Sequence, residues 1–121
     1  MQRPFTPNAG PGGNGAKAYQ CANCRALISS SDRLLAVNGH YRHHFVNPAG
    51  LQCHFYSFAS CPGSVATGIP TQEFSWFEGY GWHLAFCRIC GLHLGWRYEA
   101  AAAAVRPAEF WGMLVAHLLA R

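Results

Sequence analysis

The chain has 121 residues, of which 50% are hydrophobic, 14% are aromatic and only 12% are charged. This length corresponds to one domain, and the apolar content excludes a disordered or strongly acidic chain. Nine basic residues against five acidic residues give a formal net charge of +4. The basic residues are scattered rather than clustered in a stripe, so we expect no nucleic-acid partner.

The first segment, residues 1–18, is rich in Pro and Gly and is expected to be a flexible tail. The folded domain is then expected over residues 19–121. No apolar stretch reaches the roughly 18 residues that span a membrane, and the start has no apolar region typical of a secretory signal. We therefore expect a cytoplasmic protein with no membrane partner.

Strand signals follow along the chain. Residues 34–37 and 40–46 are separated by Asn38-Gly39, a pair typical of the tight turn in a β-hairpin. Residues 51–59 alternate in polarity and predict a strand, whereas residues 61–70 are rich in turn formers and predict a loop. Two further strands are expected at 83–86 and 93–98.

The C-terminal part is predicted to end in a short helix. Residues 99–105 are ambiguous because their alanines favour helix but the run is short. Pro107 suits a first helical turn, and apolar residues then recur at helical spacing up to residue 119. The predicted fold is therefore mostly β, with antiparallel sheets, closed by one C-terminal helix.

Two Cys-x-x-Cys pairs, separated by 62 residues, predict a metal site. They are Cys21 with Cys24, and Cys87 with Cys90. Two intervening residues allow a tight turn to direct both sulfurs at one point, and two such turns supply four thiolates to a tetrahedral zinc. Because four cysteines complete the coordination sphere, we expect one structural zinc rather than a catalytic metal.

The remaining reactive residue types give little sign of catalysis. Cys53 and Cys61 are expected to be small buried apolar residues. The adjacent His43 and His44 point to opposite faces of a strand, so they are not expected to share a metal. With five acidic residues in all, general acid–base chemistry has few candidates. We name no catalytic residue and expect no enzyme.

Aromatic residues concentrate on both sides of the second cysteine pair. Trp76 and Trp82 precede the pair, and Trp96 and Tyr98 follow it on the same face of an expected strand. These rings could simply form the core of a small β domain. They could also enclose a small flat or cationic group, because tryptophan is seldom fully buried and few charges flank the cluster.

The combined spacing resembles the thalidomide-binding (CULT) domain family of cereblon. The matching motifs are Ser75-Trp76-Phe77-x-Gly79-Tyr80-x-Trp82, the pair Cys87-x-x-Cys90, His93-x-Gly95-Trp96-x-Tyr98 and Phe110-Trp111-Gly112. Cys21-x-x-Cys24 and Asn47-Pro48 also match, so the resemblance covers about residues 19–120. The chain is most similar to the free-standing, single-domain form of bacteria, and no ubiquitin-ligase role is expected.

The resemblance implies a β-tent, in which two antiparallel sheets are pinned by the four-cysteine zinc. It also implies a cage of Trp76, Trp82 and Trp96, with Tyr98 at its base, that holds glutarimide, thalidomide-type drugs or uracil-like rings. Proteins that carry a C-terminal cyclic imide are further expected partners. The protein itself is expected to be a monomer. The main chain of Phe74 and of Trp76, and the side chain of Asn47, are implied to pair with the polar edge of the ring.

One residue departs from the family pattern, and two other functions stay open. Animal cereblons have a histidine where this chain has Phe74, so one side-chain hydrogen bond to the ligand is expected to be lost. Glu73 and Glu78 near the cage also allow a reader of methylated ammonium groups. A methionine sulfoxide reductase shares the paired cysteines and a His-Leu-Gly run, but here no cysteine follows Cys90.

Overall fold

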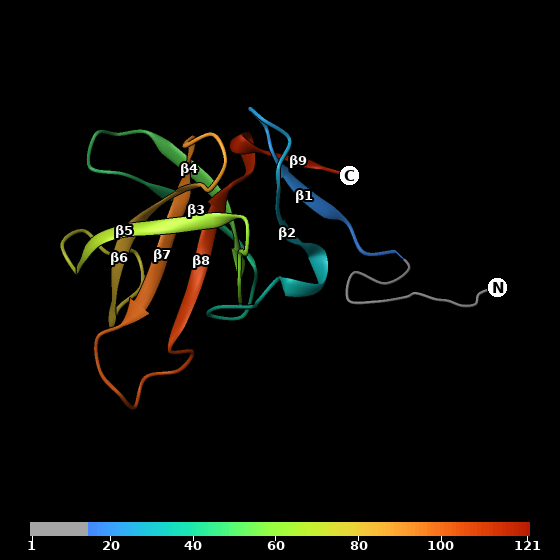
Figure 1. The fold of residues 1–121 in the computed structure, drawn as a ribbon. Helices are drawn as coiled ribbons and strands as arrows, with labels where there is room; N and C mark the ends of the chain where they lie inside the picture. Colours follow the sequence, from blue (N-terminus) through green and yellow to red (C-terminus); the bar gives the residue numbers. More distant parts are fainter. Residues whose placement is uncertain (1–14) are drawn as a thin grey trace.

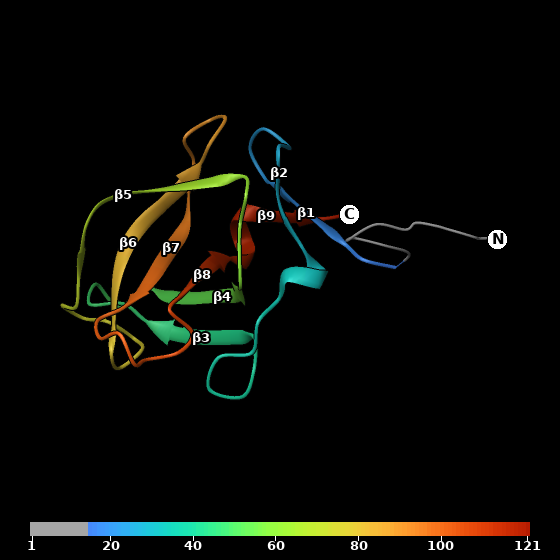
Figure 2. The same cartoon turned by 60° about the horizontal axis from the view of Figure 1, so that its bottom comes forward.

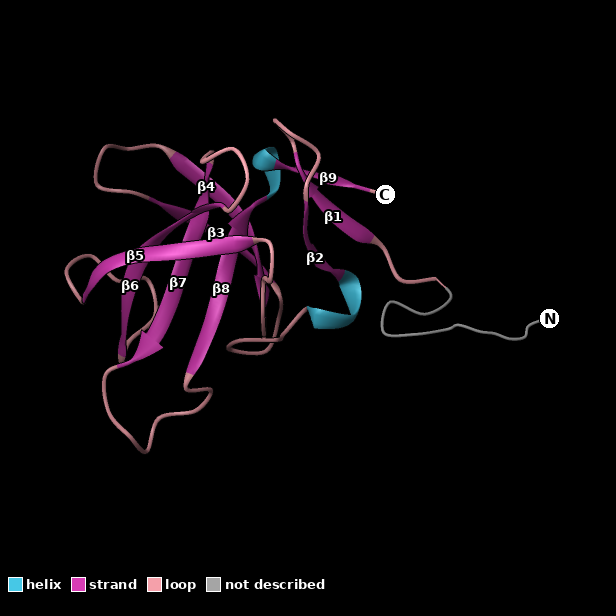
Figure 3. Ribbon diagram, viewed as in Figure 1, coloured by secondary structure: helices cyan, strands magenta, loops and turns pink. Residues whose placement is uncertain are grey.

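The computed structural model describes residues 15–121, and the regular structure in this range is mostly β-strand (Figures 1 and 3). The sequence predicts a tail over residues 1–18, and residues 1–14 of it lie outside the described residues. The first strand begins at Ala18. The strands are β1 (Ala18–Cys21), β2 (Leu27–Ser30), β3 (Arg42–Val46), β4 (Gln52–Phe58), β5 (Ser64–Thr71), β6 (Tyr80–Cys87), β7 (His93–Ala100), β8 (Glu109–Leu114) and β9 (Leu118–Ala120). Two 3₁₀ turns, η1 (Ser31–Arg33) and η2 (Val115–His117), complete the elements.

The strands form two antiparallel sheets, as the sequence predicts. The small sheet has the order β2-β1-β9, and the large sheet has the order β3-β4-β8-β7-β6-β5. The large sheet curves strongly, so that β3 and β5 at its two ends face each other across its concave side (Figure 2). The small sheet lies to one side of this curved sheet, on the right in both views (Figures 1 and 2).

Two apolar clusters form the core, and one of them joins the two sheets. One joins the small sheet to the large sheet and contains, among others, Tyr19, Ile28 and Met113. The other contains Phe77, Tyr98 and Phe110, with the tryptophans packed against it. Both clusters draw residues from β8, because neighbouring side chains on a strand point to opposite faces. The middle of the large sheet, at β8, is therefore covered by apolar groups on both faces.

The C-terminal helix expected over residues 107–119 is wrong. This segment instead forms β8 and β9, separated by the short turn η2. β8 lies in the middle of the large sheet and pairs with both β4 and β7. A central strand buried on both faces carries a nearly continuous apolar run, and periodicity alone does not distinguish such a run from a helix.

The loop expected over residues 61–70 is also wrong in part, since β5 runs through most of it. β5 is an edge strand, and its pairing with β6 is interrupted between Thr67 and Thr71. Gly68 and Pro70 lie in this interruption. Pro is tolerated on edge strands because one side of the strand makes no ladder hydrogen bonds. The turn formers that predicted a loop therefore mark an irregular edge.

The remaining sequence predictions of strands are mostly confirmed. β4, β6 and β7 contain the segments expected to be extended. Asn38 and Gly39 form the expected turn, with φ angles of 54° and 93°. Only the single bridge between Val37 and His40 closes this turn, and residues 34–37 form no strand. No helix in the described part of the chain is long and apolar enough to cross a membrane.

Candidate functional site

Four cysteine sulfurs converge where the two sheets meet. All four lie within 4.8 Å of one another, and the cluster consists of Cys21, Cys24, Cys87 and Cys90. Cys21 and Cys90 sulfurs are 3.6 Å apart, and Cys24 and Cys87 sulfurs are 3.7 Å apart. Four thiolates around zinc at about 2.3 Å would be about 3.8 Å apart, so the donors fit a tetrahedral zinc. The chain therefore carries a single structural zinc site.

The two cysteine turns have the same local geometry. The main-chain carbonyl of Cys21 accepts a hydrogen bond from the N–H of Arg25 at 2.8 Å. The main-chain carbonyl of Cys87 accepts one from the N–H of Gly91 at 2.9 Å. Arg25 and Gly91 both have left-handed backbones, with φ of 68° and 80°. One turn connects β1 to β2 and the other connects β6 to β7. Zinc held between these turns therefore fastens the small sheet to the large sheet.

An apolar cavity of about 330 Å³ opens on the concave side of the large sheet. It is lined by Asn47, Pro48, Phe74, Trp76, Trp82, Leu84, His93, Trp96 and Tyr98. The structure thus brings together all six residues that the sequence suggested for ligand binding. Pro48, Leu84 and His93 line the cavity as well and were not among those six. The apolar position of Leu84 and the place of His93 after the cysteine turn did not distinguish them from core residues.

Strand pairing positions three of the aromatic walls. Trp82 on β6 lies opposite Tyr98 on β7, and Trp96 lies opposite Leu84 in the same ladder. The rings of Trp76 and Trp96 pack edge to face, with centroids 5.2 Å apart and planes at 78°. Such aromatic pairs favour a fixed geometry. The cavity walls are therefore set by backbone register and ring packing together.

Trp76 is held by a ring of β3, and Trp82 is held by the segment between β5 and β6. The ring of Trp76 stacks on Phe45 of β3, with centroids 5.1 Å apart and planes at 7°. The indole N–H of Trp82 donates to the carbonyl of Glu73 at 2.8 Å. Because this donor is already used within the chain, Trp82 offers a ligand its ring face and not its N–H.

Polar groups without partners are found next to the rings. Within residues 15–121, the main-chain N–H and C=O groups of Phe74 and Trp76 have no hydrogen-bond partner. The side-chain oxygen of Asn47 accepts from the N–H of Ala49 at 3.0 Å and of Leu51 at 2.9 Å. The carbonyl end of this amide is thus engaged in the loop, and its NH₂ group has no partner in the described range. The cavity therefore offers both donors and acceptors at its edge.

The cavity is electrically neutral. No Asp, Glu, Lys or Arg within the described residues lines it. Burial lowers the pKa of His93 below its usual value, so the ring is uncharged at neutral pH. Burial also raises the pKa of Tyr98, which keeps the phenol protonated. Glu73 and Glu78, which kept a methylated-ammonium reader open, do not line the cavity.

Three further residues with nucleophilic side chains, Cys53, Cys61 and Ser57, are buried and do not line this cavity. Cys53 and Cys61 are 8% and 3% exposed, and burial raises the pKa of each thiol. Ser57 is fully buried and donates its hydroxyl hydrogen to the carbonyl of Leu35 at 2.6 Å. The nearby ring of His43 lies 3.0 Å from this hydroxyl. These contacts satisfy core polar groups, and none presents a reactive atom to the cavity.

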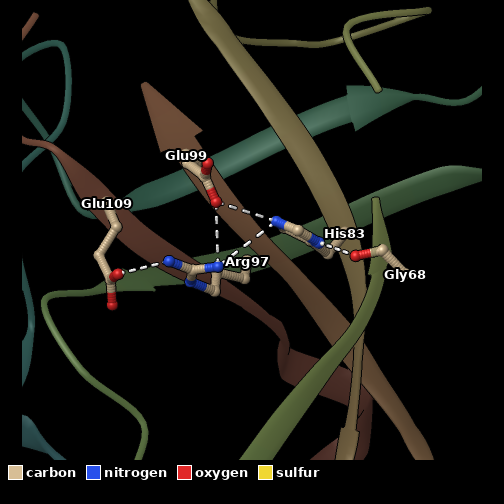
Figure 4. A network of polar contacts seen from close by, with 5 residues as sticks. All are labelled: Gly68, His83, Arg97, Glu99 and Glu109. Carbon is tan, nitrogen blue, oxygen red and sulfur yellow. Dashed lines mark hydrogen bonds and ion pairs between the residues drawn. The ribbon is translucent and has the colours of Figure 1, made fainter. Parts of the chain in front are cut away.

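A polar network covers the face of β6 and β7 opposite the cavity (Figure 4). Arg97 lies 3.1 Å from Glu99 and is also paired with Glu109 of β8 at 2.6 Å. His83 lies 3.2 Å from Glu99 and 3.1 Å from the carbonyl of Gly68 on β5. His83 follows Trp82 directly, and Arg97 follows Trp96. The network therefore links strands β5 to β8 behind the cavity walls.

Comparison with known proteins gives one family and a set of relatives. Residues 17–117 match the family model Yippee-Mis18, described as Yippee zinc-binding/DNA-binding and Mis18, centromere assembly. Protein cereblon of Gallus gallus is 39% identical over 77 residues, which are 64% of this chain and 17% of that protein. Protein cereblon of Drosophila willistoni is 30% identical over 98 residues, which are 78% of this chain and 16% of that protein. The chain spans less than a fifth of the length of these curated relatives.

Proposed function

Because the chain belongs to the Yippee-Mis18 family and is a zinc-binding, cereblon-like domain, we propose that it is a non-enzymatic binding module for cyclic imides. The ligands are glutarimide, thalidomide-type compounds and uracil-like rings. Proteins that end in a cyclic imide present the same group and are the proposed macromolecular partners. The tri-tryptophan cavity is the proposed binding site.

One observation carries the proposal: a neutral aromatic cavity has unpaired main-chain groups at its edge. A cavity of about 330 Å³ is at the small end of ligand sites, so it suits a single ring system. The faces of Trp76, Trp82 and Trp96 contact the apolar edge of that ring. The N–H and C=O groups of Phe74 and Trp76 pair with its imide edge.

Each polar group of an imide has a counterpart in this arrangement. The imide N–H needs one acceptor, and its two carbonyls need donors. The main chain of Phe74 and Trp76 supplies an acceptor and a donor, and the NH₂ group of Asn47 supplies a second donor from the opposite loop. Pairing both sides in this way avoids the cost of burying an unsatisfied polar group, about 1–3 kcal/mol.

The same cavity suits a methylated ammonium group less well. Cages for such cations combine ring faces with negative charge, and no carboxylate lines this cavity. A cation would also leave the main-chain donors at the edge unpaired. A neutral ring is therefore the better match for the available groups.

The proposal is tested by calorimetry and tryptophan fluorescence of the zinc-loaded protein. Glutarimide, uracil and a trimethyl-lysine peptide are each titrated into the wild-type protein and into the variants Trp82→Ala and Trp111→Phe. Trp111 lies outside the cavity, so Trp111→Phe is the matched control. We expect saturable imide binding that Trp82→Ala weakens at least about tenfold and Trp111→Phe leaves unchanged.

Folding of each variant is checked by its zinc content and near-UV circular dichroism. A well-folded wild type that binds neither imide nor uracil would refute the proposal. Tighter binding of the trimethyl-lysine peptide than of glutarimide would replace it with the methylated-ammonium function.

A further inference from the structure

A second hollow, larger than the aromatic cavity, lies between strand β2 and the second cysteine turn. Its volume is about 760 Å³. Two of its lining side chains are large, apolar and exposed: Leu27 is 61% exposed and Ile89 is 72% exposed. None of the residues that line the aromatic cavity contributes to it. Exposed aliphatic groups in a concave surface are typical of an interaction site.

The charged side chains that line this hollow all have one sign. Lys17, Arg33 and Arg88 line it, and no acidic residue does. The nearest acid in sequence is Asp32, whose carboxylate accepts a hydrogen bond from the hydroxyl of Ser30. Three positive charges around an apolar floor make the hollow complementary to a partner that combines carboxylates with an apolar side chain.

The two arginines are held in place without being neutralised. Arg33 donates to the hydroxyl of Ser60 at 2.8 Å. Arg88 donates to the carbonyls of Pro62 and Ser64, at 3.3 and 3.2 Å. All five acidic residues of the chain fall in the described range, and none lies within ion-pair distance of either arginine. Fixed guanidinium groups with spare donors are well suited to bind carboxylates.

From these observations, we propose that the hollow docks a short acidic peptide segment of a protein partner. One aliphatic or aromatic side chain of the segment packs on Leu27 and Ile89. Flanking Asp or Glu residues pair with Lys17, Arg33 and Arg88. Among residues 15–121, no aromatic ring lines the hollow, so this part of the chain offers no stacking surface there for the bases of a single-stranded nucleic acid.

The proposal is tested by titrating ¹⁵N-labelled, zinc-loaded protein with a synthetic eight-residue peptide of aspartates around one leucine. Two control peptides replace the leucine by serine or the aspartates by lysines. We expect saturable shifts of the amide signals of residues 27–30, 88 and 89, which weaken with added salt. Both control peptides should bind at least about fivefold more weakly.

Protein variants test each part of the surface. Arg33→Glu should weaken binding about tenfold, whereas Arg42→Glu, with the same change in charge outside the hollow, should not change it. Ile89→Ser and Leu27→Ser should each weaken it about threefold to tenfold. Asp32→Asn should strengthen binding about twofold, because a nearby negative charge is removed. Zinc content and dispersed amide signals confirm that each variant is folded.

Several results would overturn the proposal. Shifts confined to the aromatic cavity, equal binding of the three peptides, or equal weakening by Arg33→Glu and Arg42→Glu would each exclude an acidic-peptide site. Concentration-dependent shifts of residues 27–30 without any peptide would assign the hollow to a second copy of this chain instead. None of these results depends on imide binding, so the two proposals stand or fall separately.

Discussion

Phe74 combines an exposed side chain with an unusual backbone conformation. Its side chain is 65% exposed, and its φ angle is 58°, in the left-handed region that few non-glycine residues adopt. It lines the cavity, and its main-chain polar groups have no partner in residues 15–121. A strained backbone that persists next to a cavity is typical of a binding site. The proposed imide contact thus requires the main chain of Phe74 and not its phenyl ring.

Restoring a side-chain donor at this position gives a direct prediction. Phe74→His should add one hydrogen bond to the bound imide, worth about 1 kcal/mol, and so strengthen glutarimide binding about fivefold. Calorimetry of the wild type, Phe74→His and Phe74→Leu measures this. Leucine at this position keeps an apolar side chain without a donor. An affinity of Phe74→His no greater than that of Phe74→Leu would contradict the prediction.

His43 should make stability depend on pH. Desolvation, followed by the charge of nearby His40, lowers its pKa from 6.5 to about 4. The folded protein therefore holds this ring neutral, and the unfolded chain binds the extra proton between these two values. The stabilisation is complete above about pH 6.5 and is lost as the pH falls towards 4, by roughly 3 kcal/mol in total.

Urea denaturation of the wild type and His43→Gln at pH 7.5 and pH 5 tests this prediction. The wild type should lose about 2 kcal/mol more than the variant between these two pH values. Protonation of the zinc ligands affects both proteins and cancels in the comparison. Equal losses in the two proteins would show that His43 titrates normally in the folded state.

At the scale of single residues, the sequence named most of the residues that make up the candidate site. Cysteine spacing has a strict geometric meaning, so the four zinc ligands could be found without a structure. The six residues suggested for ligand binding were identified by their resemblance to a family, and the fold brings them together. Leu84 could not be found in this way, because an aliphatic residue on a strand looks the same whether it faces a core or a cavity. His93 belongs to a matching motif, but its type and position did not show that it faces the cavity.

At the scale of elements, the close approach of β7 and β8 depends on two glycines. A Cβ atom on Gly95 would lie 1.9 Å from the carbonyl oxygen of Gly112. A Cβ atom on Gly112 would lie 2.8 Å from the ring of Phe55. Backbone lies against backbone at the first contact, so no side chain can move away to make room. The strand that carries Trp96 therefore needs glycine at position 95.

This contact predicts that Gly95→Ala is severely destabilising, by more than about 3 kcal/mol. The matched control is Gly68→Ala, where a Cβ has open space but φ is 82°. That control should cost only about 1 kcal/mol, from the backbone conformation alone. Thermal unfolding followed by circular dichroism compares the two variants. Similar losses of stability would mean that β7 and β8 separate easily.

Element prediction from the sequence failed where burial hides the strand pattern. β4, β6 and β7 were found because each has a polar or glycine-rich boundary and a run of aromatic or aliphatic residues. β8 was assigned to a helix because Phe110 and Trp111 pack on opposite faces of the sheet, which removes the alternation of polar and apolar residues. β5 was missed because Gly68 and Pro70 are residues typical of loops. An edge strand such as β5 tolerates them.

At the scale of the molecule, the zinc site links the two sheets in addition to the apolar cluster that joins them. Its ligands come in equal numbers from the turn after β1 and the turn after β6. A structural zinc of this kind can contribute on the order of 10 kcal/mol to folding, which is comparable to the whole stability of a small domain. β6, which carries Trp82, ends at the zinc site, and β7, which carries Trp96, begins there.

Removal of the zinc should therefore unfold the domain. Cys24→Ser, or treatment of the wild type with a strong chelator, should abolish cooperative thermal unfolding and imide binding together. Cys53→Ser is the control, because Cys53 is a buried cysteine outside the cluster. Circular dichroism and zinc analysis measure both effects. A cooperative transition that survives complete zinc removal would show that the apolar clusters suffice.

The separation of the two cysteine turns along the chain also has a consequence in time. Cys21 and Cys24 leave the ribosome 62 residues before Cys87 is reached. At about 5–20 residues per second, this first pair of thiols waits roughly 3–12 seconds for its counterpart. During this interval the thiols are accessible to oxidants and to competing metals. The nascent domain is therefore most sensitive to oxidation and to binding of the wrong metal before its second half is synthesised. The redox state and the zinc supply of the cell then decide whether the two halves are joined correctly.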